Sequence, residues 1–314
     1  MRIVFAGSAG LACPSLLRLI NCGELEVVAV ITQPDRPSGR KLKLHSCPVK
    51  ALIECQKKLQ LPVLTPENIN DPQALEQIRG FEPEVIAVVA YGQIFREPLL
   101  QLAPHGCINL HASLLPKYRG AAPYQRAVIN GDKLTGVTTM QMDRGMDTGD
   151  IILQRETPVG NDETAGELHD RLAVLGAELL VETLSMLKDG ELERYPQDHT
   201  AASMAPKLRK RDGRIDWTLS AEVLRNRVRG MNPWPVCHCE VPSGTGKVIR
   251  VFKAAVEDGQ GRPGEVIDDG ANGPLVATGN GALRLLEVQP PGGKIMEGGA
   301  FLRGHPLSRG AMLG

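Results

Sequence analysis

An amide and an imidazole stand two residues apart at the end of a short apolar run. The run covers residues 107–111, and its polar members are Asn109 and His111. If the run is a strand, the two side chains point to the same face. Ligand sites of open α/β sheets gather at strand carboxyl ends. An amide and an imidazole there can hold a carbonyl oxygen as it becomes an oxyanion, although the same pair can be purely structural.

Three acids crowd a glycine-rich loop farther along the chain. They are Asp143, Asp147 and Asp150, and Gly145 and Gly149 lie between them. Glycine lets the backbone turn tightly and approach a ligand closely. A carboxylate in such a loop can orient a histidine and take up a proton. An ordinary acidic turn and a divalent-cation site are the alternatives, but the spacing matches no known metal loop.

Three further motifs favour structural roles. Gly7-Ser8-Ala9-Gly10 follows the first strand-like run, but it lacks the Gly-x-Gly-x-x-Gly spacing and the downstream acid of a dinucleotide site. Cys237-His238-Cys239 lacks the spacing and the additional ligands of a zinc site, so we expect a strand there. Ser113 has no base positioned as in a catalytic triad. The sequence therefore predicts neither a nicotinamide cofactor nor a metal.

The net charge is zero, which argues against a globally basic nucleic-acid binder. Two segments are nevertheless basic. Residues 33–50 carry five basic residues against one acid, and residues 205–230 carry eight against three, so the rest of the chain has a net charge of −9. A local basic footprint on a neutral protein suits a polyanionic substrate that must leave again.

The elements that must position these residues follow an α/β pattern in the first half of the 314 residues. Short runs rich in valine and isoleucine alternate with helical stretches, which predicts a parallel sheet. Two later runs alternate more evenly, as edge or antiparallel strands do. The buried runs are 3–6, 27–32, 85–90 and 107–111, the helical stretches are 48–58 and 72–79, and the alternating runs are 137–142 and 151–156.

The second half predicts a smaller domain of a different kind. A long amphipathic helix over 162–188 is followed by an aperiodic segment, and then by a short helix over 219–230 and several short strands between glycine-rich turns. Short strands with frequent turns are typical of a small β-barrel. We therefore expect a catalytic domain at 1–189, a linker at 190–206 and a second domain at 207–314.

The chain is also expected to work in the cytoplasm. No apolar run reaches the roughly 18 residues of a membrane helix, and the strand-like start leaves no room for a signal peptide. Seven cysteines form an odd number without framework spacing, which favours reduced thiols.

Residues 109–120, Asn-Leu-His-Ala-Ser-Leu-Leu-Pro-Lys-Tyr-Arg-Gly, resemble the signature of the 10-formyltetrahydrofolate-dependent formyltransferases, and residues 145–150 match its second part. The resemblance implies a Rossmann-like domain and direct transfer of a formyl group from the folate co-substrate, without a metal. It places the family's Asn–His–Asp site at Asn109, His111 and Asp147. It implies that the folate is held by Ser113, Leu114, Leu115 and Pro116, and by Val89, Tyr91, Gly92 and Ile94 around the pterin.

Within this family, the whole chain resembles the members that formylate initiator methionyl-tRNA for translation initiation. Residues 33–42 resemble their basic insertion loop, which meets the acceptor end of the tRNA, although the loop is one residue shorter here. Residues 215–217 and 232–235 resemble their C-terminal oligonucleotide-binding (OB)-like barrel. The resemblance implies a bacterial cytoplasmic enzyme, expected as a monomer, with tRNA contacts from Arg36, Arg40, Lys41, Lys43, Lys207 and Arg209.

Three rival functions stay open. A sugar-nucleotide N-formyltransferase would share the Asn–His–Asp site and a similar second domain, but would not need the basic loop. A formyltetrahydrofolate hydrolase would share the site, with water as the attacking group. A non-catalytic RNA-binding protein would use only the barrel and would leave the three site residues unexplained.

Overall fold

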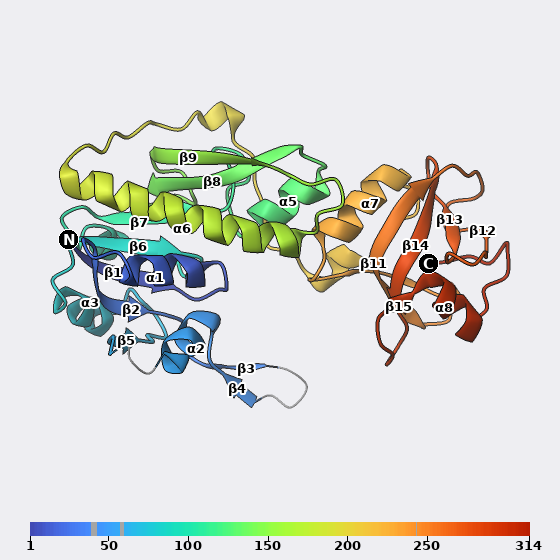
Figure 1. The fold of residues 1–314 in the computed structure, drawn as a ribbon, viewed down its shortest axis with the longest axis horizontal. Coiled ribbons are helices and arrows are strands. Elements are labelled where there is room, and N and C mark those ends of the chain that lie inside the picture. Colours follow the sequence, from blue (N-terminus) through green and yellow to red (C-terminus); the bar gives the residue numbers. More distant parts are fainter. Residues whose placement is uncertain (39–42, 57–59, 243) are drawn as a thin grey trace. The chain divides into compact units, whose positions relative to one another are not determined.

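The computed structural model describes residues 1–38, 43–56, 60–242 and 244–314, which form two compact units (Figure 1). The first unit comprises Met1–Pro123, Leu134–Pro158 and His169–Ala205, and the second comprises Tyr124–Lys133, Val159–Leu168 and Pro206–Gly314. Most of the aperiodic segment expected as a linker thus packs within the first unit. The assignment of a function to residues 1–189 and 207–314 stays a prediction.

The first unit is built on a seven-stranded sheet with the order β5-β2-β1-β6-β7-β8-β9. The first five strands of this order pair in parallel, whereas β8 and β9 pair antiparallel. The predicted parallel sheet with antiparallel later strands is therefore confirmed. The strands are β1 (Arg2–Gly7), β2 (Glu26–Ile31), β5 (Val63–Leu64), β6 (Val85–Val89), β7 (Cys107–His111), β8 (Leu134–Gln141) and β9 (Ile151–Pro158).

The basic segment after β2 contains a short antiparallel hairpin of β3 (Arg36–Ser38) and β4 (Lys43–His45). The helices of this unit follow the predicted pattern. Proline occupies the first turn of α2, α3 and α4, where its fixed φ suits the helix and its missing N–H costs nothing. The helices are α1 (Ala12–Ile20), α2 (Pro48–Cys55), α3 (Pro72–Arg79), α4 (Glu97–Leu100) and α6 (Ala165–Asp189), together with η1 (His199–Ala201).

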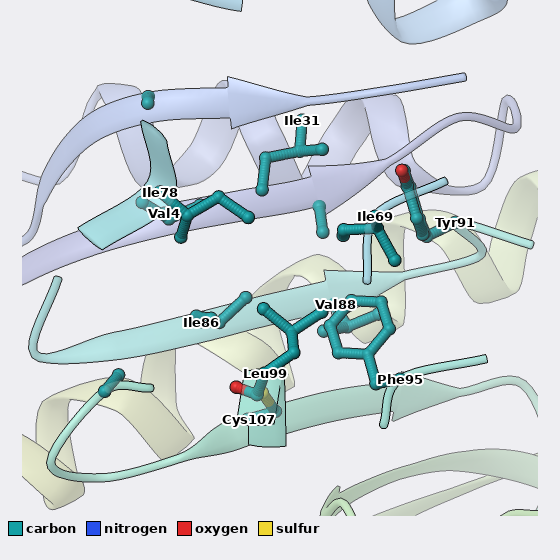
Figure 2. Close-up of a cluster of buried hydrophobic side chains, with 13 residues drawn as sticks. Val4, Ile31, Ile69, Ile78, Ile86, Val88, Tyr91, Phe95, Leu99 and Cys107 are labelled. Carbon is teal, nitrogen blue, oxygen red and sulfur yellow. The ribbon is translucent and has the colours of Figure 1, made fainter. Parts of the chain in front are cut away.

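Side chains alternate between the two faces of the sheet, and each face is covered by helices. On one face, Val4, Ile86 and Val88 pack with Ile78 of α3 and Leu99 of α4 (Figure 2). This alternation places every second residue of a strand in the same core, as the period of two requires. The buried cluster therefore fixes which face of β7 its alternate residues point to.

The opposite face of β7 is covered by α6. Gly176 of α6 lies so close to the strand that an added Cβ would stand 2.7 Å from the Leu110 side chain. A larger residue at this position would force either the Leu110 side chain or the helix to shift. Since Leu110 faces α6, its neighbours Asn109 and His111 face the side that carries α3 and α4.

The second unit contains an antiparallel sheet with the order β10-β11-β14-β13-β12, and β15 pairs with β14. This confirms a domain of short antiparallel strands. Its elements are α5 (Pro123–Ile129), η2 (Lys210–Gly213), α7 (Ala221–Gly230), β10 (Cys237–Glu240), β11 (Val248–Glu257), β12 (Val266–Asp268), β13 (Leu275–Ala277), β14 (Ala282–Gln289), β15 (Met296–Glu297) and α8 (Gly298–Gly304).

The two edges of this sheet are bridged by the segment 311–314. On one side, Val266 donates its N–H to the Ala311 carbonyl at 2.8 Å, and Leu313 donates to the Gly264 carbonyl at 2.8 Å. On the other side, Glu240 and Gly314 exchange two backbone hydrogen bonds of 2.6 and 3.1 Å. The edges β10 and β12 are thereby joined through one added segment, as a closed barrel requires.

Within the described residues, no helix is both long and apolar enough to cross a membrane.

Candidate active site

Asn109 lies on the sheet face away from α6, with a half-buried side chain. Its strand neighbours are Val88 of β6 and Met140 of β8. Among the residues that the structure describes, none is hydrogen-bonded to the Asn109 amide. Polar groups inside proteins are usually paired, so an amide left free beside the core is a donor available to a ligand.

His111 lies two residues further on the same face and is only 6% exposed. Its Nε2 atom lies 2.9 Å from the Tyr118 carbonyl oxygen. Since a carbonyl only accepts, Nε2 must carry the hydrogen of this bond. The other ring nitrogen, Nδ1, stands 3.6 Å from Oδ2 of Asp147, which is too long for a hydrogen bond but close enough for strong charge interaction.

Asp147 completes the group from the loop after β8. Its Oδ2 accepts a 2.8 Å hydrogen bond from the Gly120 N–H. Its backbone is left-handed, with φ of +52°, which non-glycine residues adopt rarely and Asp and Asn adopt most readily. Tyr118, the partner of His111, is also left-handed with φ of +63°. Such strain is often stored at functional sites.

The three acids of this loop have separate roles in the structure. The carboxylate of Asp143 accepts hydrogen bonds from the Gly145 N–H at 2.9 Å and from the Thr148 hydroxyl at 2.7 Å, and so shapes the turn. Asp150 contributes its backbone carbonyl to Gln141. Asp147 alone of the three contacts the His111 side of the site.

Backbone contacts and an ion pair fix the path of the same loop. An added Cβ at Gly149 would lie 1.8 Å from the Gln141 carbonyl oxygen, so only glycine fits there. Arg144 forms an ion pair with Glu97 of α4. Arg144 also holds the pKa of the Glu97 carboxyl below its usual range. The turn that carries Asp147 is thus anchored to β8 and α4.

A cavity of about 190 Å³ opens beside Asp147. Apolar side chains dominate its walls, and Ile94 and Met146 are 74% and 56% exposed there. Exposed large apolar side chains around a cavity are typical of a binding site for an apolar ring. The lining residues are Gln93, Ile94, Phe95, Met140, Met142, Asp143, Arg144, Gly145, Met146 and Asp147.

The segment 113–116, predicted to contact folate, is held by hydrogen bonds from β8 and β9. Thr138 donates its hydroxyl to the Ser113 carbonyl at 2.7 Å and accepts from the Leu115 N–H at 3.1 Å. Gln154 donates to the Leu115 carbonyl at 2.8 Å. The Ser113 hydroxyl is buried and donates to the Lys117 carbonyl, so it serves the turn, whereas Leu114 and Pro116 keep part of their surface exposed.

The second segment predicted to contact folate, residues 89–94, also contains both buried and exposed residues. Val89 and Tyr91 are buried in the sheet, whereas Gly92 and Ile94 are exposed, and Ile94 lines the cavity. Burial raises the pKa of the Tyr91 hydroxyl, which has no hydrogen-bond partner among the described residues. Of this segment, the structure therefore offers Gly92 and Ile94 to a ligand directly.

Two of the residues predicted to bind tRNA in the first unit, Arg36 and Lys43, lie in the β3–β4 hairpin. Arg36 is exposed and its guanidinium lies 2.7 Å from a carboxylate oxygen of Glu67. Lys43 begins β4, and its side chain is outside the described residues. Arg40 and Lys41 lie wholly outside them, so nothing in the structure bears on these two.

The residues predicted to bind tRNA in the second unit are Lys207 and Arg209. Both are exposed, and neither side chain forms an ion pair in the part of the chain that the structure describes, although the backbone N–H of Arg209 donates to Asp212. By contrast, Arg225 is paired with Asp162, and Arg229 is 8% exposed and donates to the Gly160 and Glu163 carbonyls. The charge of the 205–230 segment is therefore only partly available at the surface.

Sequence reasoning missed the residues that support the site from outside it. Gln197 donates to the backbone carbonyls of Asp147 and Gly149, and its carbonyl oxygen accepts from Arg119. The Ser203 hydroxyl accepts from the Tyr118 N–H at 2.9 Å. Gln197 and Ser203 lie in the aperiodic segment expected as a linker, and its lack of apolar periodicity gave no signal for them.

No cluster of three or more metal-binding side chains occurs among the described residues. Cys237 and Cys239 occupy the predicted strand, β10. Burial raises the pKa of each of these thiols to about 12, which disfavours the thiolate that zinc needs. All seven cysteines are free thiols.

Comparison with known proteins agrees with this arrangement. Residues 1–184 match the formyl transferase family and residues 207–306 match the formyl transferase C-terminal domain. The chain belongs to the formyl transferase family, which confirms the resemblance of residues 109–120. It is similar over its whole length to proteins named methionyl-tRNA formyltransferase. The relative from Citrifermentans bemidjiense is 48% identical, covering 100% of this chain and 96% of the relative, and that from Geobacter sulfurreducens is 46% identical, covering 100% and 97%.

Solved structures share the fold at low sequence identity. The sugar 3N-formyl transferase WlaRD has a TM-score of 0.65 at 18% identity, covering 92% of this chain and 97% of that one. HypX from Aquifex aeolicus, solved in complex with tetrahydrofolic acid, has a TM-score of 0.62 at 17% identity, covering 100% of this chain and 50% of that one. These likenesses support the architecture of both units.

Proposed function

We propose that the protein transfers the formyl group of 10-formyltetrahydrofolate to the α-amino group of methionine on initiator methionyl-tRNA. The observation that carries the proposal is the similarity, over the full length, to relatives named methionyl-tRNA formyltransferase. The site adds a chemical reason, because it joins a free amide donor, an imidazole and a carboxylate within one unit.

Asn109 is proposed as the principal oxyanion donor. The reaction joins the methionine nitrogen to the formyl carbon, breaks the bond from that carbon to N10 of the folate, and moves one proton from the amine to N10. Negative charge develops on the formyl oxygen as the new bond forms. The amide of Asn109 is free to donate to it. Removal of one such donor typically costs roughly 10²–10³ in rate.

His111 was expected to donate to the same oxygen, but both its ring nitrogens face protein acceptors. Nε2 donates to the Tyr118 carbonyl, and Nδ1 faces Asp147. We therefore assign His111 an electrostatic role beside the developing charge, with its ring orientation fixed by Tyr118. Its ion pair with Asp147 requires a hydrogen on both nitrogens.

Asp147 is proposed to accept the proton that the attacking amine releases. Its carboxylate is 18% exposed, so it can reach a substrate, and one of its oxygens is occupied by the Gly120 N–H. The second oxygen is then available for the amine. A general base must lie within hydrogen-bond reach of the proton that it takes.

The folate co-substrate is proposed to lie in the cavity beside Asp147. When bound, it supplies an electrophilic formyl carbon. The exposed Ile94 and Met146 side chains offer apolar contact to a flat heterocycle, and the polar groups of the 143–147 turn stand at the same rim. Leu114 and Pro116 present partly exposed surface on the neighbouring segment.

The tRNA is proposed to contact the exposed basic residues of both units. The side chains of Lys207 and Arg209 form no ion pair among the described residues, so their charge is free for phosphates. Arg36, Lys43, Arg40 and Lys41 of the 33–43 segment are proposed partners from the sequence resemblance. We propose that the enzyme acts as a cytoplasmic monomer.

Acceptor identity is tested by incubating the protein with 10-formyltetrahydrofolate and either methionyl-tRNA or a 4-amino sugar nucleotide. Formylated methionine, released from the tRNA by mild base and separated by chromatography, is the expected product. Formylation of the sugar nucleotide alone would overturn the proposal. Release of formate without either product would instead indicate a hydrolase.

A further inference from the structure

The side chain of Gln197 links the aperiodic segment before residue 206 to the turn that carries Asp147. It is 6% exposed and makes four hydrogen bonds. Its Nε2 donates to the Asp147 carbonyl at 3.0 Å and to the Gly149 carbonyl at 2.6 Å. Its Oε1 accepts from Arg119 Nε at 3.1 Å and from Arg119 Nη2 at 2.6 Å. The hydrogen-bonding capacity of the Gln197 amide is therefore fully satisfied.

Arg119 fixes which way the Gln197 amide points. A guanidinium only donates, so the atom facing it must be the carbonyl oxygen of Gln197. The amide nitrogen is then forced toward the two backbone carbonyls, which only accept. Arg119 is itself 6% exposed, and its Nη2 also lies 3.1 Å from Nδ1 of His199.

The same segment is fastened to the Tyr118–Gly120 region by backbone pairing. Arg119 donates its N–H to the Ser203 carbonyl at 2.8 Å, and Ala205 donates to the Arg119 carbonyl at 2.7 Å. Tyr118 supplies the carbonyl that holds His111, and Gly120 supplies the N–H that holds Asp147. The aperiodic segment thus pairs with the stretch of residues that hydrogen-bonds to His111 and Asp147.

Asp147 needs such support because its backbone is strained. A left-handed conformation is disfavoured for a non-glycine residue and persists where surrounding contacts enforce it. Gln197 holds the carbonyls of residues 147 and 149, one on each side of the turn. This contact fixes the backbone from which the Asp147 carboxylate projects toward His111.

We propose that Gln197, oriented by Arg119, is a positioning residue that sets the distance from the Asp147 carboxylate to His111. This inference rests on the proposed function. The aperiodic segment is, on this account, part of the catalytic machinery as well as a connection. Gln197 touches no reacting atom, so its contribution passes through Asp147.

The test compares kcat and KM of Gln197→Met and Gln197→Glu with wild type. Methionine keeps the size and loses all four hydrogen bonds, whereas glutamate keeps the acceptor for Arg119 and loses both donors. Because misplacing a reacting group by about 1 Å can cost around 10²-fold, we expect kcat to fall about 10- to 100-fold in both, with each KM within about threefold. Gln77→Glu, an exposed glutamine of α3, is the matched control and should leave kcat unchanged.

A double-mutant cycle separates positioning from general stability. Residues that act as a unit lose activity non-additively, so adding Gln197→Met to Asp147→Asn should lower kcat by less than about threefold. Additive losses, or a Gln197→Glu enzyme with wild-type kcat, would overturn the inference. Turnover is expressed per folded molecule, measured by near-ultraviolet circular dichroism, and Arg119→Lys gives a second perturbation if Gln197→Met folds poorly. Absence of formyl transfer by wild type would refute the proposed function itself.

Discussion

Replacing Asp147 by asparagine removes one charge while changing almost nothing else. Asparagine tolerates a left-handed backbone as aspartate does, so the φ of +52° can be kept. Its side-chain oxygen can still accept from the Gly120 N–H. The variant therefore removes the negative charge beside His111 and the proton-accepting ability of the second carboxylate oxygen.

The distance from Asp147 to His111 sets the expected loss of kcat in this variant. With the imidazole protonated, the charges on His111 and Asp147, 3.6 Å apart, attract by roughly 4–5 kcal/mol at an effective dielectric constant near 20. Solvent and rearrangement reduce this gross figure, and a surviving ~2–3 kcal/mol corresponds to about a 30- to 150-fold loss. Loss of the proton acceptor adds to it. We expect kcat of Asp147→Asn to fall by about 10² or more, with both KM values within about threefold.

Initial rates of formyl transfer to methionyl-tRNA, measured with each substrate varied in turn, supply kcat and both KM values. Asp189→Asn is the matched control, because Asp189 is exposed at the end of α6 and does not line the cavity. We expect this control to keep kcat within about threefold. The reasoning is refuted if Asp147→Asn turns over like wild type, or if the control loses as much.

Three further predictions concern other parts of the chain. Ile94→Asp, which places a charge at the apolar rim of the cavity, should raise KM for the folate about tenfold or more and leave KM for tRNA within about twofold, as separate titrations of the two substrates would show. Replacing both Lys207 and Arg209 by alanine should weaken tRNA binding and reduce the slope of log K against log salt by up to about 2, measured by filter binding, while folate KM stays unchanged. Arg284 lowers the pKa of the Glu257 carboxyl, so this pair stabilises the fold fully above the ordinary carboxyl pKa of about 4.3 and loses its effect as pH falls through the lowered pKa. Glu257→Gln should therefore lower the thermal midpoint at pH 7, and its difference from wild type should vanish below that lowered pKa.

The local pattern of apolar residues and turn signals predicted the strand and the helix that carry or border the site. The strand over 107–111 and the helix over 72–79 are found with the predicted bounds. Both are short segments whose ends are marked by the sequence itself, since β7 is a continuous apolar run and α3 opens on a proline and is followed by Gly80. The shared face of Asn109 and His111 followed directly from the strand.

Long-range contacts were not predictable in the same way. Arg119 and Gln197 are separated by 78 residues, and neither lies in a segment with an apolar period. Arg229 counts toward the basic charge of the 205–230 segment, because sequence distinguishes poorly between a solvated arginine and one that donates to buried carbonyls. The burial of Val89 and Ser113 also depends on the sheet and turn around them, which a linear motif does not contain.

The contact between Gly176 and Leu110 has a consequence for how the protein can respond to a ligand. With α6 directly behind it and β6 and β8 on either side, the strand that carries Asn109 and His111 has no room to retreat. Adaptation to a bound substrate is left to the exposed end of the 89–94 segment, because the turn that carries Asp147 is anchored as well. The fold thus holds the oxyanion donor and the proton acceptor on fixed supports, and a bound substrate can reshape the rim of the cavity without moving either of them.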